Sequence, residues 1–125
     1  MFAGKRPDNL GVTDGKLASC PGTPNCVNSQ SDQPQSQIEP LPMVSMSQLR
    51  SVIEGMERTK VIEQNDRYLY AEFTSKLMGF VDDVEFFLDS AQNVIQVRSA
   101  SRLGQSDLGV NRQRVEIIRG QLQNS

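Results

Sequence analysis

The residues best suited to chemistry lie close together in the last third of the chain. Carboxylates gather in one segment and arginines in the segments that follow; the polar set is Asp82, Asp83, Glu85, Arg98, Ser101, Arg102, Asp107, Asn111 and Arg112. Acids and bases at this density either tie neighbouring strands together or form a polar site. A polar site of this composition could bind an anion, hold a metal ion or hydrolyse a substrate.

The chain contains no histidine, which excludes several kinds of active site. Ser-His-Asp and Cys-His nucleophilic systems, imidazole general bases and most zinc sites need the imidazole nitrogen. Any catalysis would depend on carboxylates, cysteine, lysine, tyrosine or a bound metal, and we favour a protein that is not an enzyme. No cofactor is predicted.

Length and charge narrow the class of protein. A chain of 125 residues makes one domain, and a net charge of −2 gives no general attraction to nucleic acid or to anionic lipid. No run of about 18 apolar residues is present, so no transmembrane segment is predicted. Residues 1–6 lack the apolar stretch of a secretory signal, so the chain is either cytoplasmic or stromal, or a mature form whose signal has been removed.

The chain divides into two parts of different composition, and together these parts have to position the polar set. Residues 1–42 are rich in Pro, Gly, Asn, Ser and Gln with almost no hydrophobic periodicity, which predicts an extended N-terminal arm packed on the domain. Residues 43–125 are periodic and predict the core domain. The arm contains Cys20 and Cys26, separated by a turn-forming segment; a disulfide, two reduced thiols and a reactive Cys26 all stay open.

The core domain is predicted to have the order α-β-β-β-β-α. A helix from Ser45 or Ser47 to about Glu57 precedes strands over 59–63, 67–76, 81–89 and 94–101, and a last helix spans about 110–122. The fold class is therefore α+β: a four-stranded antiparallel meander flanked by two helices on one face.

The register of the hairpin over 81–89 and 94–101 follows from its apolar residues. Only one pairing lines up Phe86 with Val97, and it places Glu85 opposite Arg98 on the face away from the helices. The same pairing brings Arg102 within diagonal reach of Asp83. We therefore interpret these charges first as cross-strand ion pairs, and expect no specific stabilisation by phosphate or sulfate.

Asp82 falls on the helix-covered face in this register, opposite Ser101. A carboxylate there needs partners, and the candidates are Ser101, Arg112 and the backbone amides of 104–109. We expect Asp82→Ala to destabilise the fold more than Asp83→Ala, because Asp82 faces the core.

Other uses of the polar set stay open. The turn at 106–109 could present amides to an anion, with Arg98, Arg102 and Arg112 adding positive charge. We predict no metal, because adjacent strand residues such as Asp82 and Asp83 point to opposite faces and the arginines compete for their oxygens. The outer face also carries Tyr68, Tyr70 and Phe87, which indicates either a protein interface or a face covered by the arm.

Several motifs lie along nearly the whole chain. They are residues 2–7, 10–12, 20–21 and 24–27, then Gly79-Phe80-Val81-Asp82-Asp83-Val84-Glu85-Phe86, and the pattern of 98–112 that includes Arg98, Ser101, Arg102, Asp107, Asn111 and Arg112. Together they resemble the domain-of-unknown-function family number 1499, in a variant similar to those of cyanobacteria and plastids. The resemblance implies a small domain in an exported or membrane-attached context, with no established activity and no assigned catalytic residues.

The sequence and the resemblance together predict a non-catalytic binding or assembly module. We expect a protein partner and no nucleic acid. The resemblance implies association with photosynthetic membranes, a thylakoid-associated or lumenal location, and an oxidising compartment for the cysteines. The alternative function is a small-anion binding site or a hydrolytic enzyme that uses the Asp and Arg residues.

Overall fold

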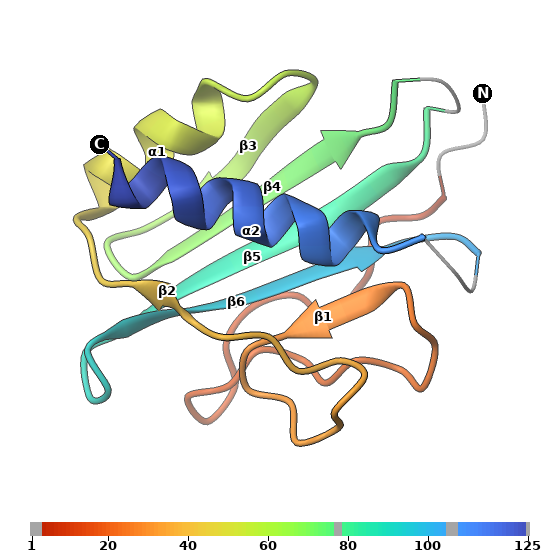
Figure 1. Cartoon of the computed structure of the whole chain (residues 1–125), viewed down its shortest axis with the longest axis horizontal. Coiled ribbons are helices and arrows are strands. Elements are labelled where there is room, and N and C mark those ends of the chain that lie inside the picture. The colour runs from red at the N-terminus through yellow and green to blue at the C-terminus, as the bar shows by residue number, and fades with distance from the viewer. Residues whose placement is uncertain (1–3, 77–78, 105–107, 125) are drawn as a thin grey trace.

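The computed structural model describes residues 4–76, 79–104 and 108–124, and shows one antiparallel sheet with two helices on one face (Figure 1). In chain order the elements are β1 (Cys26–Asn28), β2 (Leu41–Pro42), α1 (Met46–Glu54), β3 (Thr59–Gln64), β4 (Tyr68–Thr74), β5 (Val81–Asp89), β6 (Val94–Ser101) and α2 (Val110–Gln123). The strands follow the order β1-β6-β5-β4-β3, and β2 also pairs with β6. The fold is therefore α+β, as predicted.

The sheet has six strands rather than the predicted four-stranded meander. The two additional strands, β1 and β2, come from the N-terminal arm and lie along β6, which the meander alone would leave as an open edge (Figure 1). They contain three and two residues and carry no alternating apolar pattern, so periodicity could not reveal them.

The predicted register of the main hairpin is confirmed. Glu85 lies opposite Arg98, Phe86 lies opposite Val97, and Asp82 lies opposite Ser101. Strands β5 and β6 begin and end at the predicted residues. The orientation of every charged side chain on these strands follows from this pairing.

The main core lies between the helices and one face of the sheet. Leu49 and Ile53 of α1 and Val115 and Ile118 of α2 pack with the apolar residues of β4, β5 and β6, among them Phe86. Helix α1 begins where the Ser45 hydroxyl accepts a hydrogen bond from the backbone N–H of Gln48 at 3.1 Å, which stabilises its first turn.

Asp82 is held from helix α2, and the residue that holds it differs from the prediction. Its Oδ2 lies 2.8 Å from Nη2 of Arg114. Arg112 instead donates to the carbonyl oxygens of Gln35 and Gln37. Residues 111, 115, 118 and 122 form the buried stripe of α2, so Arg114 flanks the sheet and Arg112 turns away from it.

Asn111 and Ser101 also lie on the helix-covered side. The Asn111 side chain is fully buried, donates to Ser101 Oγ at 2.9 Å and to the carbonyl oxygen of Asn25 at 3.2 Å, and accepts from Ser99 Oγ at 2.6 Å. These bonds join the beginning of α2 to β6 and to the arm. Asp107 lies outside the described residues.

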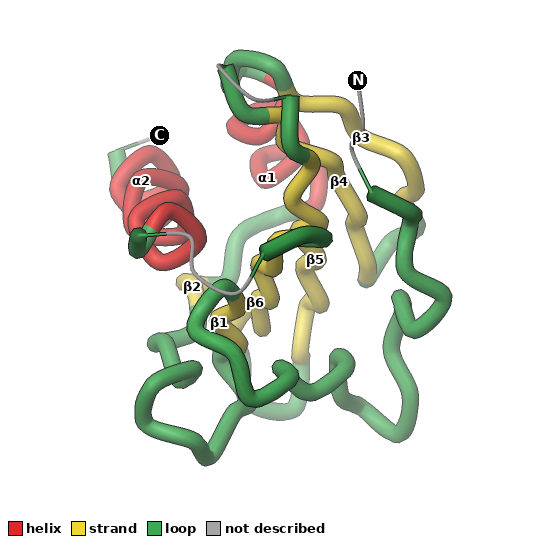
Figure 2. Tube along the Cα trace, turned by 90° about the vertical axis from the view of Figure 1, so that its right-hand side faces the viewer, coloured by secondary structure: helices red, strands yellow, loops and turns green. Residues whose placement is uncertain are grey.

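The other face of the sheet is covered by the N-terminal arm. Figure 2 shows both helices on one side of the sheet and the loops of the arm on the other. Leu17 of the arm is buried against Tyr68 and Tyr70, and the N–H of Gly11 donates to Glu85 Oε2 at 2.7 Å. The face of the sheet that lies away from the helices is therefore buried under the arm and not open to solvent.

Candidate functional site

The outer face concentrates ionisable side chains under the arm. They come from alternate positions of β4, β5 and β6 and from the residue after β6: Glu72, Asp83, Glu85, Arg98 and Arg102. Asp83, Glu85 and Arg98 are only 2%, 1% and 5% exposed. Ionised groups at this depth need partners, because removing them from water costs several kcal/mol each.

Arg102 has a complete set of partners. Its Nε donates to Asp83 Oδ2 at 2.9 Å, and its Nη2 donates to Asp83 Oδ1 at 2.8 Å and to Glu72 Oε2 at 2.6 Å. Tyr70 adds a 2.5 Å bond from its hydroxyl to Asp83, and Arg6 of the arm lies 2.7 Å from Glu72. The hydrogen bonds with Asp83 raise the pKa of Arg102, so this half of the face is a closed network.

Arg98, in contrast, is almost without partners. Its Nη2 donates to the carbonyl oxygen of Ser19 at 3.3 Å, and its Nε has no hydrogen-bond partner among the described residues. Within the described ranges no carboxylate oxygen lies within ion-pair distance of its guanidinium. Burial lowers the pKa of Arg98, whereas the field of Glu85 raises it.

The expected ion pair between Glu85 and Arg98 is therefore not formed, although the two residues are cross-strand neighbours. Glu85 Oε2 instead accepts from the Tyr68 hydroxyl at 2.6 Å and from the Gly11 N–H at 2.7 Å. Its Oε1 is buried, and no described residue forms a hydrogen bond with it. Burial raises the pKa of this carboxyl, while its bonds with Tyr68 and Gly11 act in the opposite direction.

A cavity of about 400 Å³ lies beside Arg98. Its wall combines three cationic residues, Lys5, Arg98 and Arg102, with Asp83 and the two cysteines. Cys20 and Cys26 are joined by a disulfide, with their Cα atoms 5.7 Å apart. We call this space the Arg98 cavity.

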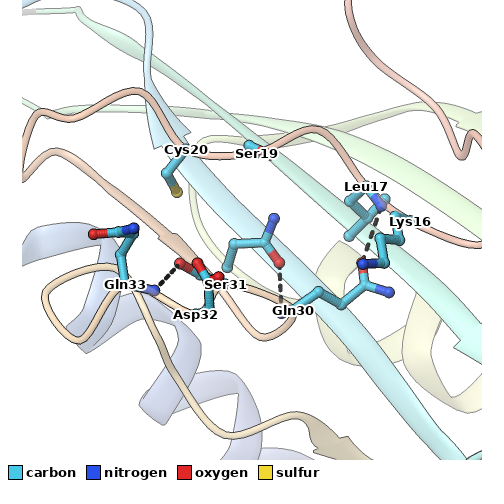
Figure 3. A pocket seen from close by; sticks show the side chains of 9 residues that line it. Lys16, Leu17, Ser19, Cys20, Gln30, Ser31, Asp32 and Gln33 are labelled. Carbon is cyan, nitrogen blue, oxygen red and sulfur yellow. Dashed lines mark hydrogen bonds between the residues drawn. The ribbon is translucent and has the colours of Figure 1, made fainter.

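A second cavity of about 410 Å³ lies next to it under the arm and shares Ser19 and Cys20 with it (Figure 3). Its polar groups bond with one another. The N–H of Leu17 donates to Gln30 Oε1 at 3.0 Å, and the N–H of Gln33 donates to Ser31 Oγ at 3.0 Å. The Arg98 cavity is the stronger candidate site, because it is lined by a buried cation that forms no ion pair with any described carboxylate.

The structure separates the predicted polar set onto two faces. Asp83, Glu85, Arg98 and Arg102 lie together under the arm, whereas Asp82, Ser101 and Asn111 lie toward α2, and Arg112 contacts the segment 35–37. Sequence reasoning missed Lys5, Ser19 and Arg114. The basic pair Lys5-Arg6 in an otherwise polar arm was a signal for the first, but nothing in the sequence marks the Ser19 carbonyl.

In residues 4–76, 79–104 and 108–124, no three Cys, Asp or Glu side chains converge so that they could hold a metal ion. No helix in those ranges is both long and apolar enough to cross a membrane.

Comparison with known proteins gives one result. A family model described as "Protein of unknown function (DUF1499)" matches residues 16–122, which include both cysteines, Arg98 and Arg102. The match carries no information about a cyanobacterial or plastid origin. No curated protein and no solved structure matches the chain.

The different surroundings of the two arginines lead to a first prediction. Arg102→Met should lower the free energy of unfolding by about 3–5 kcal/mol, because Asp83 and Glu72 would lose their buried partner. Arg98→Met should change it by less than about 1 kcal/mol or raise it, because no ion pair is broken. Urea unfolding of both variants measures the difference. Similar losses of unfolding free energy in the two variants would contradict the conclusion that Arg98 forms no ion pair with a described carboxylate.

The second prediction concerns the loss of stability when either of the two adjacent aspartates is replaced by alanine. It reverses the order that the sequence alone led us to expect. Asp83 is 2% exposed and bonded to Arg102 and Tyr70, whereas Asp82 is 8% exposed and pairs with Arg114. Asp83→Ala should therefore cost about 1–3 kcal/mol more than Asp82→Ala, since it leaves more buried donors unpaired. Urea midpoints would refute this if Asp82→Ala were the more damaging change.

The third prediction uses the raised pKa of Glu85. An unfolded glutamate ionises near pH 4.3, so above that pH the unfolded state binds fewer protons than the native state and the wild type loses stability until the native carboxyl has ionised. Glu85→Gln lacks this loss. As the pH rises above about 4, the free energy of unfolding of Glu85→Gln should increase relative to that of the wild type, by at most about 1.4 kcal/mol per pH unit, until the native Glu85 carboxyl has ionised. The exposed Glu116→Gln is the control, and parallel curves for Glu85→Gln and wild type would be the contrary result.

Proposed function

We propose that this chain, which belongs to the DUF1499 family, is a non-catalytic module that binds a small anion in the cavity beside Arg98. The observation that supports the proposal is the state of Arg98, which is 5% exposed and, among the residues that the structure describes, has no carboxylate within ion-pair distance. The arm that covers this side chain also supplies Lys5 to the same cavity.

A buried guanidinium cannot escape its desolvation cost by losing its proton, because arginine stays charged in proteins. The described part of the fold therefore keeps a cation without a directly paired counterion. A carboxylate or phosphate group in the cavity would supply that counterion, and it matches the planar fork of N–H donors. Lys5 and Arg102 add positive charge to the wall.

The size of the cavity suits a small molecule. Sites for such ligands enclose about 300–1,000 Å³. At about 400 Å³ the Arg98 cavity has room for an anionic group together with a short organic body.

The carboxylates on this face favour binding over hydrolysis. Asp83 lines the cavity, but both of its oxygens accept hydrogen bonds from Arg102. Glu85 is held by Tyr68 and Gly11 and does not line the cavity. A general base has to lie within reach of the substrate, and Glu85 lies outside the cavity wall. The Asp83 carboxylate is engaged by Arg102 and Tyr70, which compete with a substrate proton for its oxygens. A protein partner and an association with photosynthetic membranes stay predictions.

The fourth prediction replaces the expectation from the sequence that phosphate and sulfate give no specific stabilisation, because that expectation assumed an ion pair between Glu85 and Arg98. It tests the proposal by melting in chloride, sulfate, phosphate and citrate at matched ionic strength. Wild type should show a saturable rise in melting temperature with at least one multivalent anion, and a hundredfold excess over Kd corresponds to about 2.7 kcal/mol. Arg98→Met should lose the saturable part and keep the general stabilisation that sulfate and phosphate give to any folded protein.

Arg50→Met is the matched control, because Arg50 pairs with Glu54 on the exposed side of α1. It should respond as wild type does. An identical response of all three proteins to every anion would overturn the proposed function.

A further inference from the structure

The disulfide forms part of the wall of the Arg98 cavity. Cys20 and Cys26 both line it, together with Lys5, Arg98 and Arg102. The residue before Cys20, Ser19, carries the carbonyl oxygen to which Arg98 donates at 3.3 Å. An anionic group bound to Arg98 would therefore lie beside the two sulfur atoms.

The two cysteines differ in their access to a ligand. Cys26 lies on β1 with 1% of its surface exposed, whereas Cys20 lies in a loop and is partly exposed. Cys20 also lines the neighbouring cavity, and Figure 3 shows its side chain directed into that space. A molecule in either cavity can reach Cys20, so Cys20 carries the sulfur open to attack.

The surroundings of Cys26 favour its departure as a thiolate. Cys26 lies opposite Ala100 in the β1–β6 pairing, on the outer face and between the positions of Arg98 and Arg102. Nearby guanidinium groups stabilise a thiolate, and a better-stabilised thiolate is a faster leaving group in disulfide exchange.

We propose that Cys20–Cys26 is an exchange-active disulfide whose preferred reactant is a small thiol that carries carboxylates. The inference rests on the proposed anion site, because Arg98 holds the carboxylate of the incoming thiol. It extends that site from binding to a chemical step and names the class of ligand.

The step balances without any further reactant. The thiolate of the small molecule attacks Cys20 Sγ, the bond between the two protein sulfurs breaks, and its electron pair passes to Cys26 Sγ. A mixed disulfide forms at Cys20, and Cys26 leaves as a thiolate that takes the proton lost by the small thiol. The sulfur of the small thiol is oxidised and that of Cys26 is reduced.

The test measures the rate of exchange with two thiols of different charge. Oxidised full-length protein is mixed with reduced glutathione, which carries two carboxylates, or with neutral 2-mercaptoethanol. Acid-quenched samples are then analysed by mass spectrometry. Each thiol is compared only with itself across protein variants, so differences in intrinsic reactivity cancel.

We expect Arg98→Met to lower the glutathione rate about tenfold more than the 2-mercaptoethanol rate, since the cation attracts only the charged thiol. Lys5→Met should act in the same direction with a smaller effect; Lys5 is exposed on the arm, so its variant leaves the sheet intact. Arg50→Met should leave both rates unchanged, and peptide mapping should place the glutathione adduct on Cys20.

Three results would overturn the inference: equal rate changes for the two thiols, an adduct on Cys26, or a disulfide that neither thiol opens in the folded protein. If citrate or phosphate still stabilises wild type through Arg98 in those cases, the anion site stands and the disulfide is structural. If no anion stabilises the protein, the proposed function fails on its own measurement.

Discussion

The outer face of the sheet must bury ionisable side chains under an arm that has few apolar residues to cover them. The face carries Asp83, Glu85 and Arg98 at 5% exposure or less, and hydrophobic burial alone cannot compensate their loss of water. The fold meets this constraint with hydrogen bonds from the arm and from neighbouring strands. The compensation is complete around Arg102 and incomplete around Arg98, so the two halves of the same face have opposite properties.

The attachment of the arm depends on the same polar groups. Arg6 reaches Glu72 and Gly11 reaches Glu85, whereas Leu17 adds apolar burial against Tyr68 and Tyr70. Because the first two contacts involve ionisable groups, the position of the arm is coupled to the charge state of the face beneath it. Binding of an anion at Arg98 would act on the arm through the Ser19 carbonyl and the disulfide next to it.

Much of the fold could be predicted from the sequence where apolar residues alternate. The bounds of β5 and β6 followed from the strand pattern on either side of the turn at 90–93. The facing of Glu85 and Arg98 followed from lining up Phe86 with Val97. The short strands β1 and β2 could not be predicted, because their pairing is imposed by the free edge of β6 and leaves no periodic pattern in the arm. On α2 the predicted partner of Asp82 was Arg112, and the observed partner is Arg114, two positions later. The apolar stripe of α2 predicts which side of the helix packs on the sheet, but it does not predict which residue beside that stripe reaches Asp82.

The candidate site shows a different limit of prediction. Register makes Glu85 and Arg98 neighbours, and on a two-stranded hairpin neighbours of opposite charge would pair. Here the Glu85 carboxylate instead accepts hydrogen bonds from the Tyr68 hydroxyl and from the Gly11 amide, which lies more than seventy residues earlier in the chain. Local pattern cannot anticipate such competition from a distant segment. Within the residues that the structure describes, the result is a buried cation without a directly paired counterion. This is a local departure from the rules of stable packing of the kind that natural proteins retain at functional sites. That departure is why both proposals begin at Arg98 rather than at the better-bonded Arg102.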